Sequence, residues 1–237
     1  MAKKIKNFPH FFTVRRAVEK VIHHTSEIFE IRLSRYHENF YPGQYISIIS
    51  DQPSIYREYS IASGTTEPWF SFIIRKIPEG KITRFLYFLQ PQETITTSLP
   101  AGNFRPGFAQ KNGEFIFIAT GTGVAPFVSY LKSYPHRPPR QILYGVRYLK
   151  EAIVLPELKQ HCPTLLAISR EKIAGHHYGH VTDLLDKLPI NSTIHYYLCG
   201  LQNMILEVSR WLKQQGVSKT QIHQDTFSSE SFESLID

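Results

Sequence analysis

The chain has 237 residues, of which 42% are hydrophobic and 20% charged, and it contains 16 Phe and 13 Tyr. This composition excludes a disordered chain, and the length is that of one large or two ordinary domains. The net charge of +7 suits an anionic partner or cofactor, and residues 1–108 carry most of it, with 14 Lys and Arg against 9 Asp and Glu. No basic block beyond Lys3, Lys4 and Lys6 resembles a nucleic-acid arm, so we expect no nucleic-acid partner.

The two cysteines, Cys162 and Cys199, are too few for a disulfide scaffold or for an iron–sulfur cluster held by thiolates alone. Any such cluster must therefore belong to a partner. No apolar run reaches the roughly 18 residues of a membrane span, and the basic N-terminus lacks the apolar stretch of a signal peptide. We therefore expect a cytoplasmic protein without a membrane span, and we expect it to be a monomer.

Residues 11–99 predict an antiparallel β-barrel or sandwich that carries one helix. Their segments are rich in β-branched and aromatic residues, and several alternate apolar with polar side chains, as half-buried strands do. Turn signals at Pro42-Gly43 and Glu79-Gly80 separate them, and residues 82–89 (ITRFLYFL) form the one helical segment. The predicted strands are residues 11–18, 27–34, 44–50, 58–63, 69–76 and 93–99.

Residues 115–216 predict an α/β domain with an open, doubly wound parallel sheet. Residues 115–120 (FIFIAT) form a continuous apolar run, as buried parallel strands do, and residues 123–134 follow with helical spacing. A linker-like segment precedes residue 115, so we expect domains of residues 1–108 and 109–237. The alternation of strand and helix continues through residues 141–146, 155–162, 164–169, 180–188, 194–200 and 202–216.

A glycine motif, Gly121-Thr122-Gly123, lies between a predicted strand and a predicted helix. Glycines at such a turn let backbone N–H groups approach a pyrophosphate. Pro126 replaces the last glycine of the dinucleotide-binding fingerprint, so this motif by itself is equally consistent with a tight turn.

Four motifs in this order and spacing resemble the ferredoxin–NADP reductase superfamily. The resemblance covers residues 12–227 and implies an FAD-binding antiparallel β-barrel domain, then an NAD(P)-binding domain, with a flavin ring held between them for a nicotinamide to reach. The implied cofactors are FAD and NADP, with NAD as the alternative to NADP. The motifs are Arg57-Glu58-Tyr59-Ser60, Gly80-Lys81-Ile82-Thr83, Gly121–Phe127, and Cys199-Gly200 with Met204.

In the first domain the resemblance assigns Arg57 to the FAD pyrophosphate, because a guanidinium fork matches phosphate oxygens. Tyr59 would lie against the flavin ring, and Ser60 would offer its hydroxyl to flavin N5. Gly80–Thr83 would present N–H groups and a hydroxyl to the diphosphate. The alternatives are a surface ion pair for Arg57, ordinary core packing for Tyr59, a backbone hydrogen bond for Ser60 and a plain helix cap for Thr83.

In the second domain the resemblance places Cys199 beside the nicotinamide, although an isolated buried cysteine is usually inert packing. Asp225 would replace the family's usual Glu near the flavin. Phe227 would shield the ring, or Phe232 would do so from the tail that follows. The residues implied in catalysis are thus Ser60, Cys199 and Asp225. The remaining residues assigned to the dinucleotide are Gly121, Thr122, Gly123, Pro126, Gly200 and Met204.

The preference for NADP or NAD depends on the residues that contact the adenosine end of the dinucleotide. Ser169-Arg170-Glu171 follows a predicted strand and resembles the segment that meets the extra phosphate in NADP-using members. Arg147 would add a phosphate contact, whereas His180 stands where a basic residue is common. A neutral His is a weaker phosphate partner, so NADP is favoured over NAD but not required.

The sequence offers one alternative site, because His176, His177 and His180 lie close together. No carboxylate or thiolate adjoins them, so we interpret them as a solvated loop and expect no metal. The expected function is hydride transfer between NADP(H) and FAD, then single-electron exchange with an acidic carrier such as ferredoxin or flavodoxin. The alternatives are a reductase of free flavin, a haem protein or an oxygenase, and a non-catalytic electron-transfer or regulatory subunit.

Overall fold

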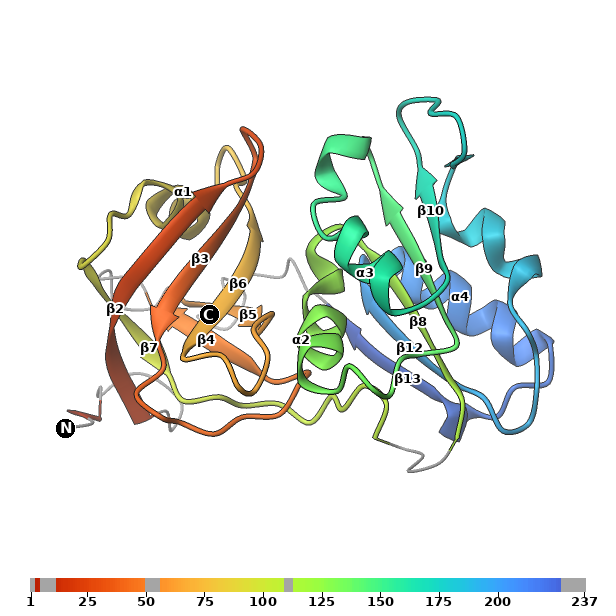
Figure 1. Ribbon diagram of the computed structural model, residues 1–237, viewed down its shortest axis with the longest axis horizontal. Coiled ribbons are helices and arrows are strands. Elements are labelled where there is room, and N and C mark those ends of the chain that lie inside the picture. The colour runs from red at the N-terminus through yellow and green to blue at the C-terminus, as the bar shows by residue number, and fades with distance from the viewer. Residues whose placement is uncertain (1–2, 5–11, 50–55, 109–112, 227–237) are drawn as a thin grey trace, which may run out of the picture. The chain divides into compact units, whose positions relative to one another are not determined.

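The computed structural model describes residues 3–4, 12–49, 56–108 and 113–226. The chain divides into two compact units, which Figure 1 shows as ribbons. The first unit comprises Met1–Pro106 with Ala125–Pro138, and the second comprises Gly107–Val124 with Pro139–Asp237. The sequence-based domain boundary at residue 108 stays a prediction.

The first unit is a nearly closed antiparallel barrel, as the sequence predicts. Its strands follow the order β5-β4-β7-β2-β3-β6, with β1 paired to β2. Ala62 N donates to Ser71 O at 2.7 Å, which links the chain after β5 to β6 and brings the two ends of the order together. The strands are β1 (Lys3–Lys4), β2 (Phe12–His23), β3 (Ile28–Ser34), β4 (Tyr45–Ile49), β5 (Tyr56–Ser60), β6 (Trp69–Arg75) and β7 (Thr94–Ser98).

Two helices belong to this unit, α1 (Lys81–Phe88) and α2 (Ala125–Ser133). The apolar face of α1 joins the barrel core, where Ile82 and Leu86 pack among buried aromatic and aliphatic side chains from the strands. In α2, Ser129 donates from Oγ to the carbonyl of Ser63 at 2.7 Å. α1 therefore adds its buried face to the core formed by the strands, and α2 is held to the barrel by this hydrogen bond.

A fully buried arginine, Arg16, lies on β2 of the barrel. Arg16 forms an ion pair with Glu38 at 2.6 Å and donates from Nε to Thr97 Oγ1 at 2.8 Å. Its guanidinium also lies 4.9 Å from the centre of the Phe70 ring. A buried cation is tolerated only when it is paired and hydrogen-bonded, and these contacts meet that condition.

The second unit is a parallel sheet of order β11-β10-β9-β8-β12-β13, which agrees with the predicted doubly wound domain. The order runs outward in both directions from β8, so the direction of winding switches between β8 and β12. The strands are β8 (Phe115–Thr120), β9 (Gln141–Val146), β10 (Thr164–Ile168), β11 (His177–Tyr178), β12 (His195–Gly200) and β13 (Ile222–Thr226).

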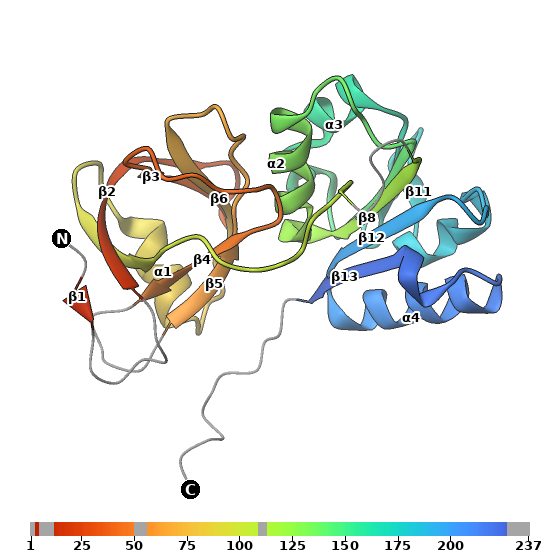
Figure 2. The ribbon, with the colours of Figure 1, turned by 90° about the horizontal axis from the view of Figure 1, so that it is seen from below.

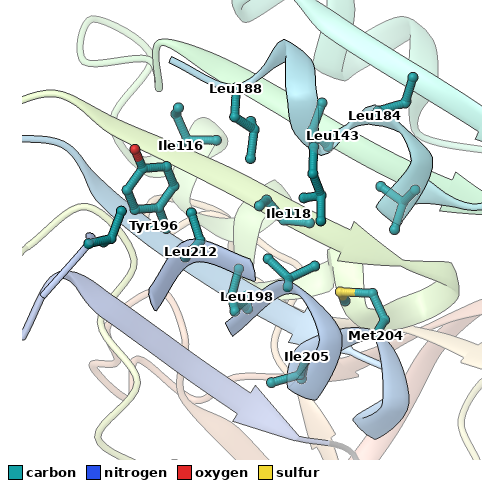
Figure 3. Packing of buried hydrophobic residues seen from close by; sticks show 14 of the residues in the cluster. Ile116, Ile118, Leu143, Leu184, Leu188, Tyr196, Leu198, Met204, Ile205 and Leu212 are labelled. Carbon is teal, nitrogen blue, oxygen red and sulfur yellow. The ribbon is translucent and has the colours of Figure 1, made fainter. Parts of the chain in front are cut away.

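Helices cover both faces of this sheet, with α3 and α4 on opposite sides in Figure 2. On one face, α4 and η3 bury a cluster that includes Ile116, Leu143 and Leu198 from the strands, shown in Figure 3. No helix in the described ranges has the length and apolar character needed to cross a membrane. The helices are α3 (Leu155–His161), α4 (Gln202–Gln214), and the 3₁₀ segments η1 (Gly121–Val124), η2 (Leu149–Glu151), η3 (Val181–Lys187) and η4 (Lys219–Gln221).

The structure differs from the predicted elements in the second unit. The helix predicted over 180–188 is the shorter 3₁₀ segment η3, whose buried Val181, Leu184 and Leu185 are spaced by three and four residues, so the apolar pattern alone does not distinguish it from an α-helix. Strands β11 and β13 were not predicted. Both are polar and lie at the two edges of the sheet, where the continuous apolar run of a central strand is not required.

Candidate functional site

The predicted residues of the second unit lie together at the carboxyl ends of the parallel strands. Because neighbouring strands run in the same direction, their carboxyl ends lie side by side, and ligands of such sheets bind beyond these ends, where the winding switches. The glycine turn follows β8, Arg147 follows β9, Ser169 and Arg170 follow β10, Cys199 and Gly200 end β12, and Asp225 lies near the end of β13.

At the switch between β8 and β12 the two backbones approach closely. A Cβ on Gly123 would lie 2.5 Å from Gly200 Cα, and a Cβ on Gly200 would collide with Thr120 Oγ1. Leu201 N donates to the same Thr120 hydroxyl at 2.9 Å. Glycine is therefore required at both positions, which brings the Cys199-Gly200 turn against the glycine turn.

Gly121 leaves open space at the same turn. Its φ is +55°, which favours glycine, and an added Cβ would meet no atom within 4 Å. Its carbonyl accepts from the Tyr144 phenol at 3.2 Å, which anchors the turn to β9. A glycine turn with free space beside it, at the switch point of a parallel sheet, fits a dinucleotide phosphate.

Cys199 is fully buried between two strands, with Ala119 of β8 and Asp225 of β13 as its register partners. Burial raises the pKa of its thiol well above the ordinary value, and the Asp225 carboxylate raises it further. The thiol is therefore neutral at physiological pH. It can pack beside a ring and hold its position, but it is not an activated nucleophile.

The other residues predicted to contact the dinucleotide differ in burial and in location. Met204 is 6% exposed and packs in the cluster beneath the sheet, as Figure 3 shows, so it anchors the start of α4. Pro126 is buried in the first turn of α2, which belongs to the first unit. Thr122 is half-buried in η1. Phe227 and Phe232 lie outside the described residues.

Beyond β9 and β10, two exposed arginines lie on adjacent loops, since Arg170 N donates to Arg147 O at 2.9 Å. The two nearby carboxylates are occupied by backbone donors. Glu151 accepts from Arg147 N at 3.2 Å, and Glu171 accepts from Leu149 N. No ion pair to either guanidinium occurs within the described ranges, so both cations are available to an anion.

The His176–His180 segment includes β11 and the turn that leads into η3. The sequence showed no adjoining carboxylate, but folding places Asp183 Oδ2 3.1 Å from His177 Nε2. His180 precedes η3: its backbone carbonyl accepts from Asp183 N at 3.1 Å, and its own N–H donates to Asp183 Oδ2 at 2.7 Å. These contacts give the segment a structural role. Within the described residues, no group of three or more potential ligands is placed to hold a metal ion.

In the first unit, β5 carries Arg57, Tyr59 and Ser60. Arg57 is exposed and donates to Tyr56 O at 2.8 Å, with no carboxylate partner among the described residues. The Tyr59 ring packs against the barrel core, and its buried hydroxyl has no hydrogen-bond partner in the described part of the chain. Burial raises the pKa of this phenol and Arg57 partly offsets that effect, so the group is a neutral donor. Ser60 is 5% exposed, opposite Tyr45 of β4.

A buried donor without a partner beside an unpaired guanidinium fits a phosphate- and hydroxyl-bearing cofactor such as FAD. Such a donor is costly to leave unsatisfied, so a ligand acceptor would stabilise it. The surface ion pair considered for Arg57 is not formed with any described residue.

The start of α1 offers the expected N–H donors, whereas the Thr83 hydroxyl bonds within the chain. The Thr83 hydroxyl accepts from Ile77 N at 3.0 Å and lies 3.3 Å from Gly80 O, so it closes the loop before α1. Gly80 has no room for a side chain, because a Cβ would lie 2.6 Å from that hydroxyl. The N–H groups of Lys81, Ile82 and Thr83 have no acceptor among the described residues, as at most helix starts. The backbone, rather than the hydroxyl, is therefore free for a diphosphate.

Sequence reasoning missed two residues of this site. Thr120 holds the Gly200 turn through its hydroxyl, and Tyr144 holds the Gly121 carbonyl. Thr120 is recognisable as the one polar residue that ends an apolar strand before the glycines. Tyr144 lies inside another apolar strand, and no pattern in the sequence distinguishes it.

Comparison with known proteins identifies a domain family for each of the two parts of the chain. Residues 15–105 match the model of the oxidoreductase FAD-binding domain, and residues 117–210 match that of the oxidoreductase NAD-binding domain. The chain therefore carries binding domains for the predicted cofactors, FAD and a nicotinamide dinucleotide.

Two curated relatives illustrate the range of similar proteins. One relative is the ferredoxin–NAD(P)(+) reductase component of the naphthalene 1,2-dioxygenase system of Pseudomonas putida. The two sequences are 30% identical over a match that covers 89% of this chain and 67% of that protein. The chain is 28% identical to ferredoxin–NADP reductase A of Sorangium cellulosum, with 84% of this chain and 82% of that protein covered. For three other relatives, the chain spans 51% to 66% of their length.

A solved structure shares the fold. The ferredoxin NADP+ reductase from Neisseria gonorrhoeae with bound FAD and NADP superimposes with a TM-score of 0.80 at 19% identity. The match covers 90% of this chain and 98% of the other. The likeness supports the two-domain arrangement of a barrel followed by a parallel sheet.

Proposed function

The chain belongs to the ferredoxin–NADP reductase-like superfamily of oxidoreductases, and we propose that it transfers a hydride between NADP(H) and FAD and exchanges single electrons with an acidic carrier such as ferredoxin or flavodoxin. The membership confirms the resemblance seen in the sequence. The observation that carries the proposal is the switch point of the second unit, where an open glycine turn adjoins a buried, neutral Cys199.

On the nucleotide side, groups of the second unit bind the pyrophosphate and orient the nicotinamide. The backbone of Gly121–Gly123 receives the pyrophosphate, because the free space at Gly121 and the N–H groups of a glycine turn suit an anion. Cys199 and Gly200 form the surface on which the nicotinamide rests. Since the Cys199 thiol keeps its proton, it adds no charge beside a ring whose charge changes during transfer.

On the flavin side, Arg57 and the free N–H groups at the start of α1 hold the diphosphate, and Tyr59 donates from its buried phenol to the cofactor. Ser60 is the expected hydrogen-bond donor at the reacting nitrogen. When bound, FAD accepts a hydride as an electron pair and releases electrons singly. The meeting of Ser60 with Cys199 in one reacting centre is part of this proposal.

The adenosine end favours NADP. Arg147 and Arg170 are exposed, close together and without a carboxylate partner in the described residues, whereas Glu151 and Glu171 are bonded to backbone N–H groups. A site for NAD would need a free carboxylate for the ribose hydroxyls. A site for NADP needs cations for the phosphate, and these are present.

The carrier is inferred from charge. The chain carries +7, and residues 1–108 hold 14 of the basic side chains against 9 acidic ones. Complementary charge speeds the encounter between proteins and fixes their orientation. A second candidate function, delivery of electrons to an oxygenase component, is favoured by the 30% identical relative, which is named as part of a dioxygenase system.

Stopped-flow reduction of the purified flavoprotein tests the proposal. We expect a yellow protein whose flavin is bleached by NADPH at least about tenfold faster than by NADH at equal, subsaturating concentration. Ferredoxin reduction should then follow and fall steeply with salt. A colourless or inert chain would favour a non-catalytic subunit, and rapid reduction of free flavin without bound FAD would favour a flavin reductase.

A further inference from the structure

The solvent face of α1 carries large aromatic side chains where a surface helix is usually polar. Its positions 81, 84, 85 and 88 share one face, because they are spaced by three and four residues. Phe85 is 43% exposed and Phe88 is 65% exposed. Lys81 and Arg84 are also exposed, whereas Ile82, Thr83 and Leu86 on the opposite face are buried. The four exposed residues, Lys81, Arg84, Phe85 and Phe88, are called the α1 patch.

The patch is supported by the barrel beneath it. The Phe88 ring meets Tyr87 edge-on at 5.1 Å, and Tyr87 in turn contacts His23 at 4.3 Å and Phe29 at 5.3 Å. A ring held in this way loses little conformational entropy when a partner covers it. The exposed Phe88 is thus prepared for a contact that the described residues do not supply.

The charged residues of the α1 patch and its neighbour Lys76 are all basic. No residue of α1 is acidic, and Lys76 lies beside the helix with its ammonium 3.8 Å from the Tyr87 ring centre. Within the described ranges, Lys76, Lys81 and Arg84 form no ion pair with a carboxylate. Glu79, exposed in the loop before α1, is the nearby acidic side chain in the sequence. An apolar centre with a cationic rim is the usual anatomy of a protein interface that attracts an acidic partner.

We propose that the α1 patch is the docking surface for the acidic electron carrier. Phe85 and Phe88 form its apolar centre, and Lys81 and Arg84, together with the neighbouring Lys76, form a cationic rim. The proposal rests on the carrier named in the proposed function and adds the surface that recognises it. An anionic membrane is the weaker occupant, because this eight-residue helix exposes only two aromatic rings, and membrane binding scales with the apolar area that a helix can bury in the lipid.

Two variants test the surface directly, each with a matched control on α4 of the second unit. Arg84→Glu reverses a rim charge, and Phe88→Ala removes the more exposed ring. Arg210→Glu and Leu206→Ala make the same kinds of change at exposed positions of α4. Binding of a plant-type [2Fe–2S] ferredoxin to each FAD-loaded protein is measured by calorimetry at low and high salt. NADPH oxidation with ferricyanide is measured in parallel.

We expect Arg84→Glu and Phe88→Ala each to weaken ferredoxin binding by about tenfold or more, as loss of a central aromatic or reversal of a steering charge does. The salt dependence of binding should become shallower in Arg84→Glu. The α4 controls should stay within about twofold of the parent protein, since neither touches the patch. Ferricyanide reduction should be unchanged in all four variants, because a small acceptor needs no docking surface.

Other results would overturn the proposal. Equal affinity of the parent and both α1 variants would place the carrier elsewhere, and loss of FAD from Phe88→Ala would assign the ring to the cofactor. If the variants lose binding only to phosphatidylserine vesicles, the patch is a membrane contact. Failure of the parent protein to bind ferredoxin would exclude this docking role, while retained ferricyanide reduction would show that the hydride step of the proposed function still stands.

Discussion

Cys199 of β12 and Asp225 of β13 are register partners in the parallel sheet, so a carboxylate lies across from a fully buried thiol beside the glycine turn. The same pairing joins a residue of a central strand to one of an edge strand. Burial and the Asp225 charge act in the same direction on the Cys199 thiol, and both keep it protonated.

We predict that both thiols of the native protein resist alkylation. Burial raises the pKa of the Cys162 thiol to about 11, and Cys199 is more deeply buried. Alkylation needs the thiolate, so neither cysteine should react with iodoacetamide at neutral pH until the protein is unfolded. Mass spectrometry counts the labels. Asp225→Asn should leave Cys199 unlabelled, because burial is the larger cause, and rapid labelling of that variant would contradict this account.

Replacing Arg57 should weaken FAD binding without unfolding the barrel. A charge-assisted bond to a phosphate contributes about 1.5 to 3 kcal/mol, so Arg57→Gln should raise the Kd for FAD by roughly tenfold to a hundredfold. The side chain is exposed and bonds only to Tyr56 O among the described residues, so thermal stability of the apoprotein should be unaffected. Flavin fluorescence measures the Kd, with Arg210→Gln as the control. Unchanged affinity would assign the pyrophosphate to other groups.

Arg170→Ala should change the nucleotide preference. We expect the KM for NADPH to rise about tenfold while that for NADH changes little, because the lost interaction involves only the additional phosphate. Steady-state kinetics with ferricyanide gives both values. Arg140→Ala is a suitable control, since Arg140 pairs with Glu114 at the amino ends of the strands, away from the predicted phosphate contact. A parallel rise in both KM values would mean that Arg170 contacts a part common to both nucleotides.

Arg16→Met should cost about 3 kcal/mol of unfolding free energy. The change leaves Glu38 without its partner and removes the donor to Thr97. Breaking a buried ion pair on one side costs about 3 to 5 kcal/mol, and we expect the lower end because Glu38 is 21% exposed. Urea denaturation of the apoprotein measures the loss. Glu38→Leu added to Arg16→Met should recover part of it, because the isolated charge is then removed. A double variant no more stable than the single one would show that the ion pair is not the cause.

The His195–His223 pair should make stability depend on pH. The rings stack with Nδ1 of His195 2.8 Å from Nε2 of His223, and Tyr197 stacks on the second ring at 4.4 Å. Burial lowers the pKa of both imidazoles, and His195 lowers that of His223 further. As pH falls through about 6.5, the unfolded chain takes up protons before the folded protein does. The unfolding free energy should therefore decrease as the solution becomes acidic, and be largest above that pH.

His223→Gln should flatten this dependence, because one of the two titrating groups is removed while a hydrogen-bonding side chain is kept. Urea titrations across the acidic to neutral range measure it, with His136→Gln, in the exposed turn after α2, as the control. An identical slope in the parent and His223→Gln would assign the acid sensitivity to other groups.

Much of this site could be read from local patterns, because its chemistry is concentrated in short contiguous motifs. Arg57–Ser60 lies on one strand and Gly121–Gly123 on one turn, so neighbours in sequence are neighbours in space. The bonds of Thr83 were harder to predict, since the choice between a phosphate and Ile77 depends on how the loop before α1 closes. The Asp183 partner of His177 lies six residues away and becomes visible only once η3 forms.

The periodicity of apolar residues was sufficient to predict an antiparallel barrel or sandwich followed by a parallel sheet, because alternating and continuous apolar runs bury different faces; the choice of a barrel came from the resemblance. Spacing between motifs was sufficient to identify the superfamily. Pairing across strands was decided by tertiary structure alone. The edge strand β13 is polar and carries no pattern of its own, so only the fold could place Asp225 beside Cys199 and set the register that joins them. Burial likewise depends on every neighbour at once, which is why the unpartnered Tyr59 phenol and the exposed Phe88 ring emerged only from the structure.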